Sequence, residues 1–313
     1  MNIVNEIDKA IQSEILNGLL KEQKVIPSKY FYDEKGSLLF DNICKLDEYY
    51  PARTEMIIMK NNIKDIISLF DKNTLLVELG SGSSLKTRIL LSNIKNLKGY
   101  IPIDISEDHL VKSVENITER YPNLNVYPVV GDYTKEIEFP DVFKSSKKKI
   151  AFFPGSTIGN FTKQQAKYFL RIIADAFGKD SGLLIGIDRI KSKSVLEAAY
   201  NDSKGVTAAF NLNILDHINY ILQTDFEINN FYHKAVYNEV ENRIEMYLFT
   251  KKDCYVNIGE HKIKLTEGEK ILTEYSHKYS IDSFKELLDD RYQLVNVWSD
   301  ENAYFSVLYL RTK

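Results

Sequence analysis

The chain has 313 residues, with 41 basic and 44 acidic side chains and a formal net charge of −3. This balance is atypical of dedicated nucleic-acid or membrane-surface binders, which usually carry a strong basic excess. Its 44% hydrophobic and 27% charged residues are typical of a globular protein with a buried core. Two cysteines, Cys44 and Cys254, are too few for a disulfide framework or a cysteine-built zinc site. With no secretory signal and no apolar run near the roughly 20 residues of a membrane span, we expect a cytoplasmic protein.

The first fifty residues are expected to be mostly helical, and Pro51 is expected to end any helix that reaches it. From Thr74 onward, short apolar runs alternate with helical segments. Strands are expected over residues 74–79, 99–104, 125–130, 149–153 and 182–188, with helices over 86–93, 108–120 and 166–177. This alternation implies right-handed crossovers and therefore an α/β fold with a doubly wound parallel sheet.

Between about residues 190 and 278 the alternation breaks. A helix is expected over 206–223, followed by strands over 234–237, 243–249 and 254–258, which together indicate an α+β insertion. A helix over 280–288 and two strands over 294–298 and 304–310 then close the chain.

The sharpest local signal is the segment Glu78-Leu79-Gly80-Ser81-Gly82, between a predicted strand and a predicted helix. Glycines at such a turn let a ligand lie against exposed backbone amides. Asp104 ends the next strand, where a carboxylate can accept both hydroxyls of a ribose, and Gly131-Asp132-Tyr133 ends the third, where it can hold an adenine. Ligands of doubly wound sheets bind beyond the carboxyl ends of the strands, so these residues predict a nucleotide-type cofactor.

NAD and S-adenosylmethionine (SAM) both suit a lone G-x-G turn. The dinucleotide fingerprint has a third glycine, and Leu85 stands in its place here. The missing glycine and the Gly131-Asp132-Tyr133 segment favour SAM. A third interpretation is that Gly80 and Gly82 merely allow a tight strand-to-helix turn.

Six further motifs occur in one order that is shared by a single family. They are Tyr30-Phe31-Tyr32-Asp33 with Gly36-Ser37, Tyr49-Tyr50-Pro51-Ala52-Arg53-Thr54-Glu55, Gly155-Ser156-Thr157-Ile158-Gly159-Asn160, Gly205-Val206-Thr207-Ala208-Ala209-Phe210-Asn211, Arg243-Ile244-Glu245-Met246 and Leu272-Thr273-Glu274. Over roughly residues 25–310 the sequence resembles the L-histidine Nα-methyltransferases of ergothioneine biosynthesis. Members of that family convert histidine to its trimethylammonium betaine, hercynine, with three molecules of SAM. The six motifs in register are far more specific than the glycine turn.

The resemblance implies a Rossmann-like class I methyltransferase fold, a doubly wound sheet joined to an α+β substrate-binding domain built from the amino terminus and the insertion. The methyltransferase domain would comprise residues 53–189 and 279–313, and the histidine-binding domain residues 1–52 and 190–278. We expect a monomer that acts on the small molecule L-histidine, with no nucleic-acid or membrane partner and no metal, since the five histidines share no common spacing.

The resemblance also assigns site residues. SAM would be contacted by Gly80, Gly82, Lys86, Asp104, Asp132 and Tyr133. The substrate would be met by residues that match the carboxylate-binding positions (Asn160, Tyr200), the imidazole-binding positions (Tyr49, Glu274, Ser276), the positions beside the reacting amine (Tyr32, Gly155) and the pocket wall (Met246).

From the residues alone, some of these have plainer explanations. Glu274 could be a surface carboxylate in a charged turn, and Asn160 could cap a helix that starts near Lys163. If residues 274–276 are extended, Glu274 and Ser276 share one face of a strand, and such a pair favours an imidazole over an indole, which has one donor and no acceptor. A related amino-acid N-methyltransferase with another substrate or fewer transfers stays open, as do a binding protein of the same fold without turnover and, least favoured, a nicotinamide dehydrogenase.

Overall fold

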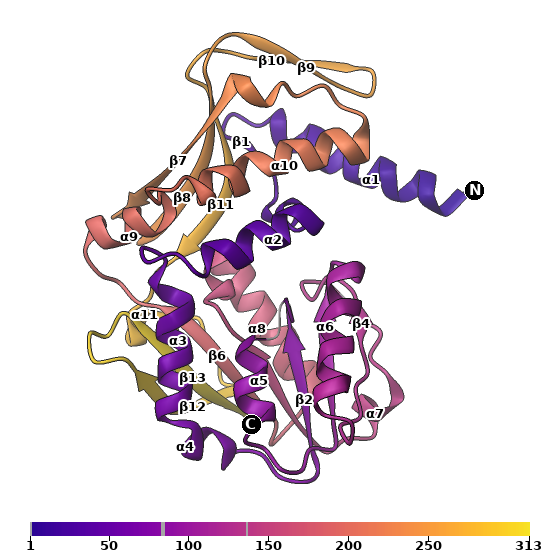
Figure 1. The fold of residues 1–313 in the computed structure, drawn as a ribbon, viewed down its shortest axis with the longest axis vertical. Helices are drawn as coiled ribbons and strands as arrows, with labels where there is room; N and C mark the ends of the chain where they lie inside the picture. Colours follow the sequence, from indigo (N-terminus) through magenta and orange to yellow (C-terminus); the bar gives the residue numbers. More distant parts are fainter. Residues whose placement is uncertain (1, 83–84, 136) are drawn as a thin grey trace. The chain divides into compact units, whose positions relative to one another are not determined.

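The computed structural model describes residues 2–82, 85–135 and 137–313 (Figure 1). The chain forms two compact units: unit 1 is Met1–Tyr49 with Ser192–Tyr275, and unit 2 is Tyr50–Lys191 with Ser276–Lys313. The expected divisions, after residues 52, 189 and 278, lie close to these. Which ligand each unit binds stays a prediction.

Unit 2 is built on a seven-stranded sheet with the order β12-β13-β6-β5-β2-β3-β4. Five strands run parallel: β2 (Thr74–Leu79), β3 (Gly99–Asp104), β4 (Val129–Val130), β5 (Lys148–Phe153) and β6 (Gly182–Asp188). β13 (Phe305–Thr312) pairs antiparallel with both β6 and β12 (Tyr292–Ser299). The expected doubly wound, Rossmann-like α/β sheet is confirmed.

Helices cover both faces of this sheet. On one face lie α7 (Asp141–Lys144), α8 (Lys163–Phe177) and α11 (Ile281–Lys285), and on the other lie α3 (Tyr50–Asn61), α4 (Ile63–Ile67), α5 (Leu85–Leu91) and α6 (Glu107–Arg120). Strand alternation sends Val77 into the first core and Leu76 into the second. Burying each such side chain contributes about 1.5–3 kcal/mol, which explains why the sequence of β2 is a continuous apolar run.

Two expectations for unit 2 are wrong. Pro51 does not end a helix but is the second residue of α3, where its missing N–H matters little because first-turn N–H groups have no intrahelical partner. The strand expected over 125–130 is shorter, since Pro128 cannot donate to a ladder and β4 consists of Val129–Val130. Before Pro128, Val126 forms a single bridge to Tyr100.

Unit 1 is the α+β part of the chain. Its four-stranded sheet has the order β1-β11-β8-β7, formed by β1 (Lys24–Val25), β7 (Phe231–Asn238), β8 (Arg243–Thr250) and β11 (Lys270–His277). A hairpin of β9 (Cys254–Ile258) and β10 (His261–Leu265) accompanies α1 (Asn2–Leu19), α2 (Glu34–Ile43), α9 (Lys193–Tyr200) and α10 (Val206–Leu222). Lys24 lies opposite Ile271 in the parallel β1–β11 pair, which joins the amino-terminal segment to the insertion.

Candidate active site

The glycine turn after β2 holds the carboxylate at the end of β3. Gly80 and Gly82 have φ values of 77° and 45°, in the region where a side chain would be strained. The Gly82 N–H donates to Asp104 Oδ2 at 2.9 Å, and the Ser106 N–H donates to Oδ1 at 3.0 Å. The two glycines are therefore required by the backbone, and they bring the Asp104 carboxylate against the turn.

Tyr133 joins this cluster from the segment after β4. Its ring packs edge-on against Phe153, with 5.4 Å between centroids, and a Cβ added to Gly80 would lie 3.4 Å from its Cε1. Burial, together with the nearby charges of Asp104 and Asp132, raises the pKa of Tyr133 far above that of a free phenol. Tyr133 is therefore a neutral phenol beside the glycine turn.

A buried carboxylate joins Lys86 to the turn after β5. Glu55, in α3, is 0% exposed; both its oxygens accept the Gly155 N–H, at 3.0 and 3.1 Å, and Lys86 Nζ lies 2.5 Å from Oε2. Space for this carboxylate depends on Gly186, where an added Cβ would lie 2.4 Å from Glu55 Oε1. Sequence reasoning missed Glu55 as a functional residue, although it ends the motif that begins at Tyr49.

The segment after Gly155 leads to Asn160. Gly155 and Ser156 both have left-handed backbones, with φ values of 81° and 59°, and the short helix η2 (Thr157–Asn160) follows. Asn160 does not cap the next helix: Thr162 does so, through a capping box with Gln165. The capping explanation for Asn160 is therefore wrong; a role in shaping the loop is not tested, and its role in binding stays a prediction.

Unit 1 brings four of the predicted substrate residues together. The rings of Tyr49 and Tyr200 meet edge-on, with 6.0 Å between centroids, and both side chains are buried. Burial raises the pKa of Tyr49 well above its usual value, and Tyr200, Glu274 and Tyr32 are near enough to raise it further. These four residues are called the phenol cluster below, and its Tyr49 is a neutral hydrogen-bonding group at neutral pH.

The first motif shapes the turn that places Tyr32. Asp33 caps α2 by accepting the Gly36 N–H at 2.6 Å, and a Cβ on Gly36 would lie 1.7 Å from the Phe31 carbonyl oxygen. The Tyr32 ring then packs edge-on against Phe210 of α10, with 5.9 Å between centroids. Asp33 and Gly36 are thus structural, and they set the position of a residue proposed to lie beside the substrate amine.

Glu274 lies in strand β11 and not in a charged turn, so that alternative is wrong. Because residues 274–276 are extended, Glu274 and Ser276 project from the same face of the strand, as expected. Met246, in β8, is 2% exposed, and its carbonyl accepts the Thr273 hydroxyl at 3.1 Å. Residue 273 is thus held to β8 directly before Glu274.

Within each unit, the predicted residues converge to different degrees. In unit 2, contacts or nearby charges link the cofactor candidates Gly80, Gly82, Asp104, Asp132 and Tyr133, while Glu55 links Lys86 to Gly155. In unit 1, the phenol cluster gathers Tyr32, Tyr49, Tyr200 and Glu274, whereas Asn160 and Ser276 belong to unit 2.

Among the described residues, no three His, Cys, Asp or Glu side chains gather as a metal ion would require. Over the same residues, no helix combines the length and apolar character needed to cross a bilayer. The monomeric state and the cytoplasmic location stay predictions.

The sequence of this chain is similar to sequences of known methyltransferases over almost its whole length. A profile of the family described as "Histidine-specific methyltransferase, SAM-dependent" matches residues 11–312. The histidine N-alpha-methyltransferase of Mycolicibacterium smegmatis is 36% identical over 306 residues, which cover 96% of this chain and 94% of that protein. The enzyme of the same name from Mycobacterium tuberculosis is 35% identical over 95% of this chain and 94% of its own. Ergothioneine biosynthesis protein 1 of Schizosaccharomyces pombe is 29% identical over 92% of this chain and 39% of that longer protein.

Proposed function

Because the chain belongs to the histidine-specific, SAM-dependent methyltransferase family, we propose that it transfers methyl groups from SAM to the α-amine of L-histidine. Three successive transfers would give hercynine, the trimethylammonium betaine that precedes ergothioneine. The observation that carries this proposal is the phenol cluster, where Tyr49 lies beside Tyr200 and Glu274. Buried hydroxyls next to a carboxylate suit a small polar ligand with N–H donors.

In this proposal SAM occupies the carboxyl ends of β2, β3 and β4. Asp104 would accept the ribose hydroxyls, Asp132 the adenine amino group, and Tyr133 would pack against the adenine. Lys86, whose side chain is 20% exposed, would pair with the carboxylate of the methionine part. The support for this assignment is that Gly82 already holds Asp104 at the turn where a ligand can approach the backbone closely.

Methyl transfer is an in-line displacement at carbon. The lone pair of the substrate amine forms a new C–N bond, the C–S bond breaks, and the sulfur leaves as the neutral thioether S-adenosylhomocysteine. Because the methyl group is already activated by the sulfonium, the protein contributes mainly alignment, an effect that supplies up to about 7–11 kcal/mol.

The amine must lose a proton before each attack. The α-amine of a peptide has a pKa of about 7.7–8.0, and the adjacent carboxylate of free histidine raises that pKa further, so most of the amine is protonated near neutral pH and a minor neutral fraction reacts. The Gly155 carbonyl can accept a hydrogen bond from the ammonium group and guide its proton to water, which carries the proton away, and we propose that Tyr32 contacts the amine. A dimethylated amine still has a lone pair, whereas the quaternary product cannot react again, so the reaction stops at three methyl groups.

Substrate choice depends on the ring. We propose that Glu274 accepts the imidazole N–H, that Tyr49 and Ser276 also contact the ring, that Met246 lines the pocket, and that Asn160 and Tyr200 bind the substrate carboxylate. A carboxylate enclosed by the bound ligand discriminates strongly, because a ligand that lacks the donor leaves the charge unsatisfied.

One experiment tests acceptor and endpoint together. The purified enzyme is incubated with SAM and an equimolar pool of the twenty amino acids, and the products are identified by mass spectrometry. We expect histidine alone to gain mass, ending at three methylene units. Methylation of tryptophan instead would overturn the substrate assignment, and a histidine product that stops at one methyl group would overturn the hercynine endpoint. An unchanged pool would overturn the proposed activity.

A further inference from the structure

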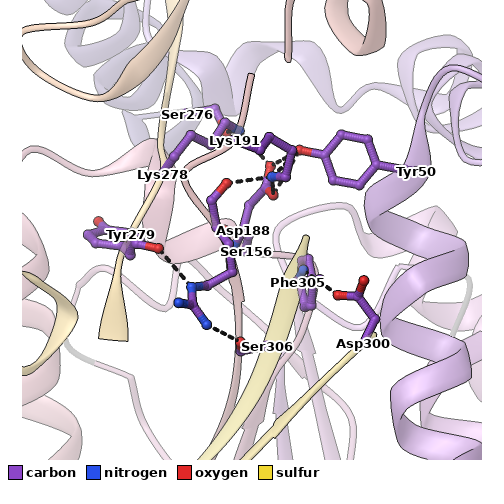
Figure 2. Close-up of polar contacts among 11 residues, drawn as sticks. Tyr50, Ser156, Asp188, Lys191, Ser276, Lys278, Tyr279, Asp300, Phe305 and Ser306 are labelled. Atoms are coloured by element: carbon purple, nitrogen blue, oxygen red, sulfur yellow. Dashed lines mark hydrogen bonds and ion pairs between the residues drawn. The ribbon is translucent and has the colours of Figure 1, made fainter. Parts of the chain in front are cut away.

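Two lysines converge on one buried carboxylate at the carboxyl end of β6 (Figure 2). Asp188 is 1% exposed; Lys278 Nζ lies 2.9 Å from Oδ2, and Lys191 pairs with Oδ1. The Tyr50 hydroxyl donates to the same carboxylate at 2.7–2.8 Å. The side chains of Lys278 and Lys191 are 0% and 5% exposed. The group therefore combines two positive charges with one negative charge out of contact with water.

Lys278 also reaches a residue of the proposed substrate site. Its Nζ donates to Ser276 Oγ at 2.7 Å. An ammonium group has three hydrogens and no lone pair, so Ser276 is the acceptor in this contact and its own proton points away from Lys278. The adjacent positive charge polarises the hydroxyl, which strengthens it as a donor and disfavours a second cation beside it.

We propose that Lys278 is a positioning residue that makes Ser276 a hydrogen-bond donor, so that the enzyme binds the neutral imidazole and rejects the imidazolium. A neutral imidazole offers one donor and one acceptor, whereas the protonated ring offers two donors and a positive charge. This inference rests on the proposed function, in which Ser276 contacts the substrate ring.

The second lysine, Lys191, also pairs with Asp188, and substituting it provides a matched control. Lys278→Met removes one positive charge and leaves Asp188 paired with Lys191. Lys191→Met leaves Asp188 paired with Lys278 and keeps the contact to Ser276. Each variant therefore retains one cation on one buried anion, the arrangement in which neither charge is left without compensation.

Asp188 keeps its negative charge at both pH values of the test, whereas Lys191 begins to lose its positive charge towards the upper one. Burial alone would raise the pKa of Asp188, but the two lysines outweigh it and hold that pKa below its usual value. Burial and the like charge of Lys278 lower the pKa of Lys191 to about 8, which Asp188 and the more distant Asp300 partly oppose, so Lys191 is protonated at pH 5.5. The Tyr50 hydroxyl donates a hydrogen bond to the Asp188 carboxylate.

Two further residues flank Ser276 and Lys278 on the same segment. Burial raises the pKa of Tyr279 far above its usual value, so this phenol stays neutral. His277 is 2% exposed and packs on Tyr279, with 6.3 Å between ring centroids.

The test is calorimetric titration of L-histidine into the enzyme saturated with S-adenosylhomocysteine, at pH 5.5 and pH 7.5, in two buffers of different ionisation enthalpy. An imidazole with a pKa of about 6.5 is about nine-tenths protonated at pH 5.5. Selection of the neutral ring, with the α-amine still protonated in this complex, therefore predicts release of about 0.9 proton per histidine bound at pH 5.5, and affinity about tenfold weaker at pH 5.5 than at pH 7.5. We expect Lys278→Met to reduce this ratio to less than about threefold, and Lys191→Met to retain about tenfold.

Three results would overturn the inference: histidine binds the wild type at pH 5.5 without proton release, Lys278→Met keeps the tenfold ratio, or Lys191→Met loses it equally. Thermal melting and S-adenosylhomocysteine affinity report whether each variant folds. If Lys278→Met does not fold, a wild type that binds histidine at pH 5.5 without proton release still overturns the inference. Methylation of histidine without proton release would remove only this inference, whereas a wild type that neither binds nor methylates histidine would remove the proposed function as well.

Discussion

Glu55 accepts the Gly155 N–H through both carboxylate oxygens, at 3.0 and 3.1 Å, from a position with no solvent exposure. The same carboxylate pairs with Lys86. One side chain of α3 thus connects a residue proposed to bind the cofactor with a residue proposed to lie beside the reacting amine. Since Gly155 and Ser156 both have left-handed backbones, this contact also stabilises a strained turn.

We predict that Glu55→Ala lowers the free energy of unfolding by about 3 kcal/mol, the lower end of the range for breaking a buried ion pair, because Lys86 is partly exposed. Glu55→Gln should lower it by about 1 kcal/mol, since the amide oxygen still accepts the Gly155 N–H. Urea unfolding measures both values. Glu107→Ala, which removes an exposed carboxylate from α6, is the control and should change little. Equal losses for the two Glu55 variants would contradict the role of the Gly155 contact.

Asp104→Ala is predicted to weaken SAM binding by about 10–100-fold, which corresponds to loss of hydrogen bonds to a charged group. The loss has two sources: the ribose loses its acceptor, and the Gly82 N–H loses the partner that fixes the turn. Calorimetric titration with SAM measures the effect. Asp108→Ala removes an exposed carboxylate from the helix that follows β3 and should leave the affinity unchanged. Wild-type affinity in Asp104→Ala would remove Asp104 from the cofactor site.

Local pattern was sufficient for the parallel sheet and for its ligand-binding edge. Continuous apolar runs identify strands that are buried on both faces, and polar residues at their carboxyl ends identify Gly80 and Asp104. The same rule could have found Asp188, which ends β6, because it is also an acidic residue at a strand end. Its partner Lys278 was not predictable, since it comes from a segment 90 residues further along the chain.

Proline was the main source of error at element boundaries. Proline fixes its own φ angle and lacks a backbone N–H, but the consequence depends on where it lies. Pro51 is tolerated in the first turn of α3, whereas Pro128 cannot donate a hydrogen bond to a neighbouring strand, so β4 begins after it. The hydrophobic pattern also failed to predict β11, the strand that carries Glu274. Buried and exposed side chains do not alternate along it, since residues 271–273 are all buried. The resemblance to a family was needed to single out Glu274 and Tyr49.

Glu274→Ala is predicted to weaken histidine binding by about 10–100-fold while leaving SAM affinity within about twofold, because a charged acceptor for the ring N–H is lost. Titration of each ligand into the same preparation separates the two effects. Glu267→Ala, in the exposed turn before β11, is the matched control and should bind both ligands normally. A Glu274 variant that loses both ligands equally would indicate damage to the fold instead of loss of a ring contact.

Glu78, at 1% exposure beneath the glycine turn, gives the protein a predicted pH dependence of stability. Burial raises its pKa from 4.5 to about 8 and outweighs the opposing hydrogen bonds from Thr87 and Tyr100. The folded-state pKa of Glu78 lies above its unfolded-state pKa, so the folded protein favours the protonated carboxyl. The stability that the protonated carboxyl contributes is fully present below about pH 4.5 and is lost as the pH rises through about 8. Glu78→Gln keeps the shape and cannot ionise, and the two hydroxyls can each donate or accept. The unfolding free energy of this variant relative to wild type should therefore rise from pH 5 to pH 8.5 in urea titrations, whereas that of Glu119→Gln, on the exposed face of α6, should stay constant. A difference that does not change with pH would show that Glu78 is ionised throughout this range.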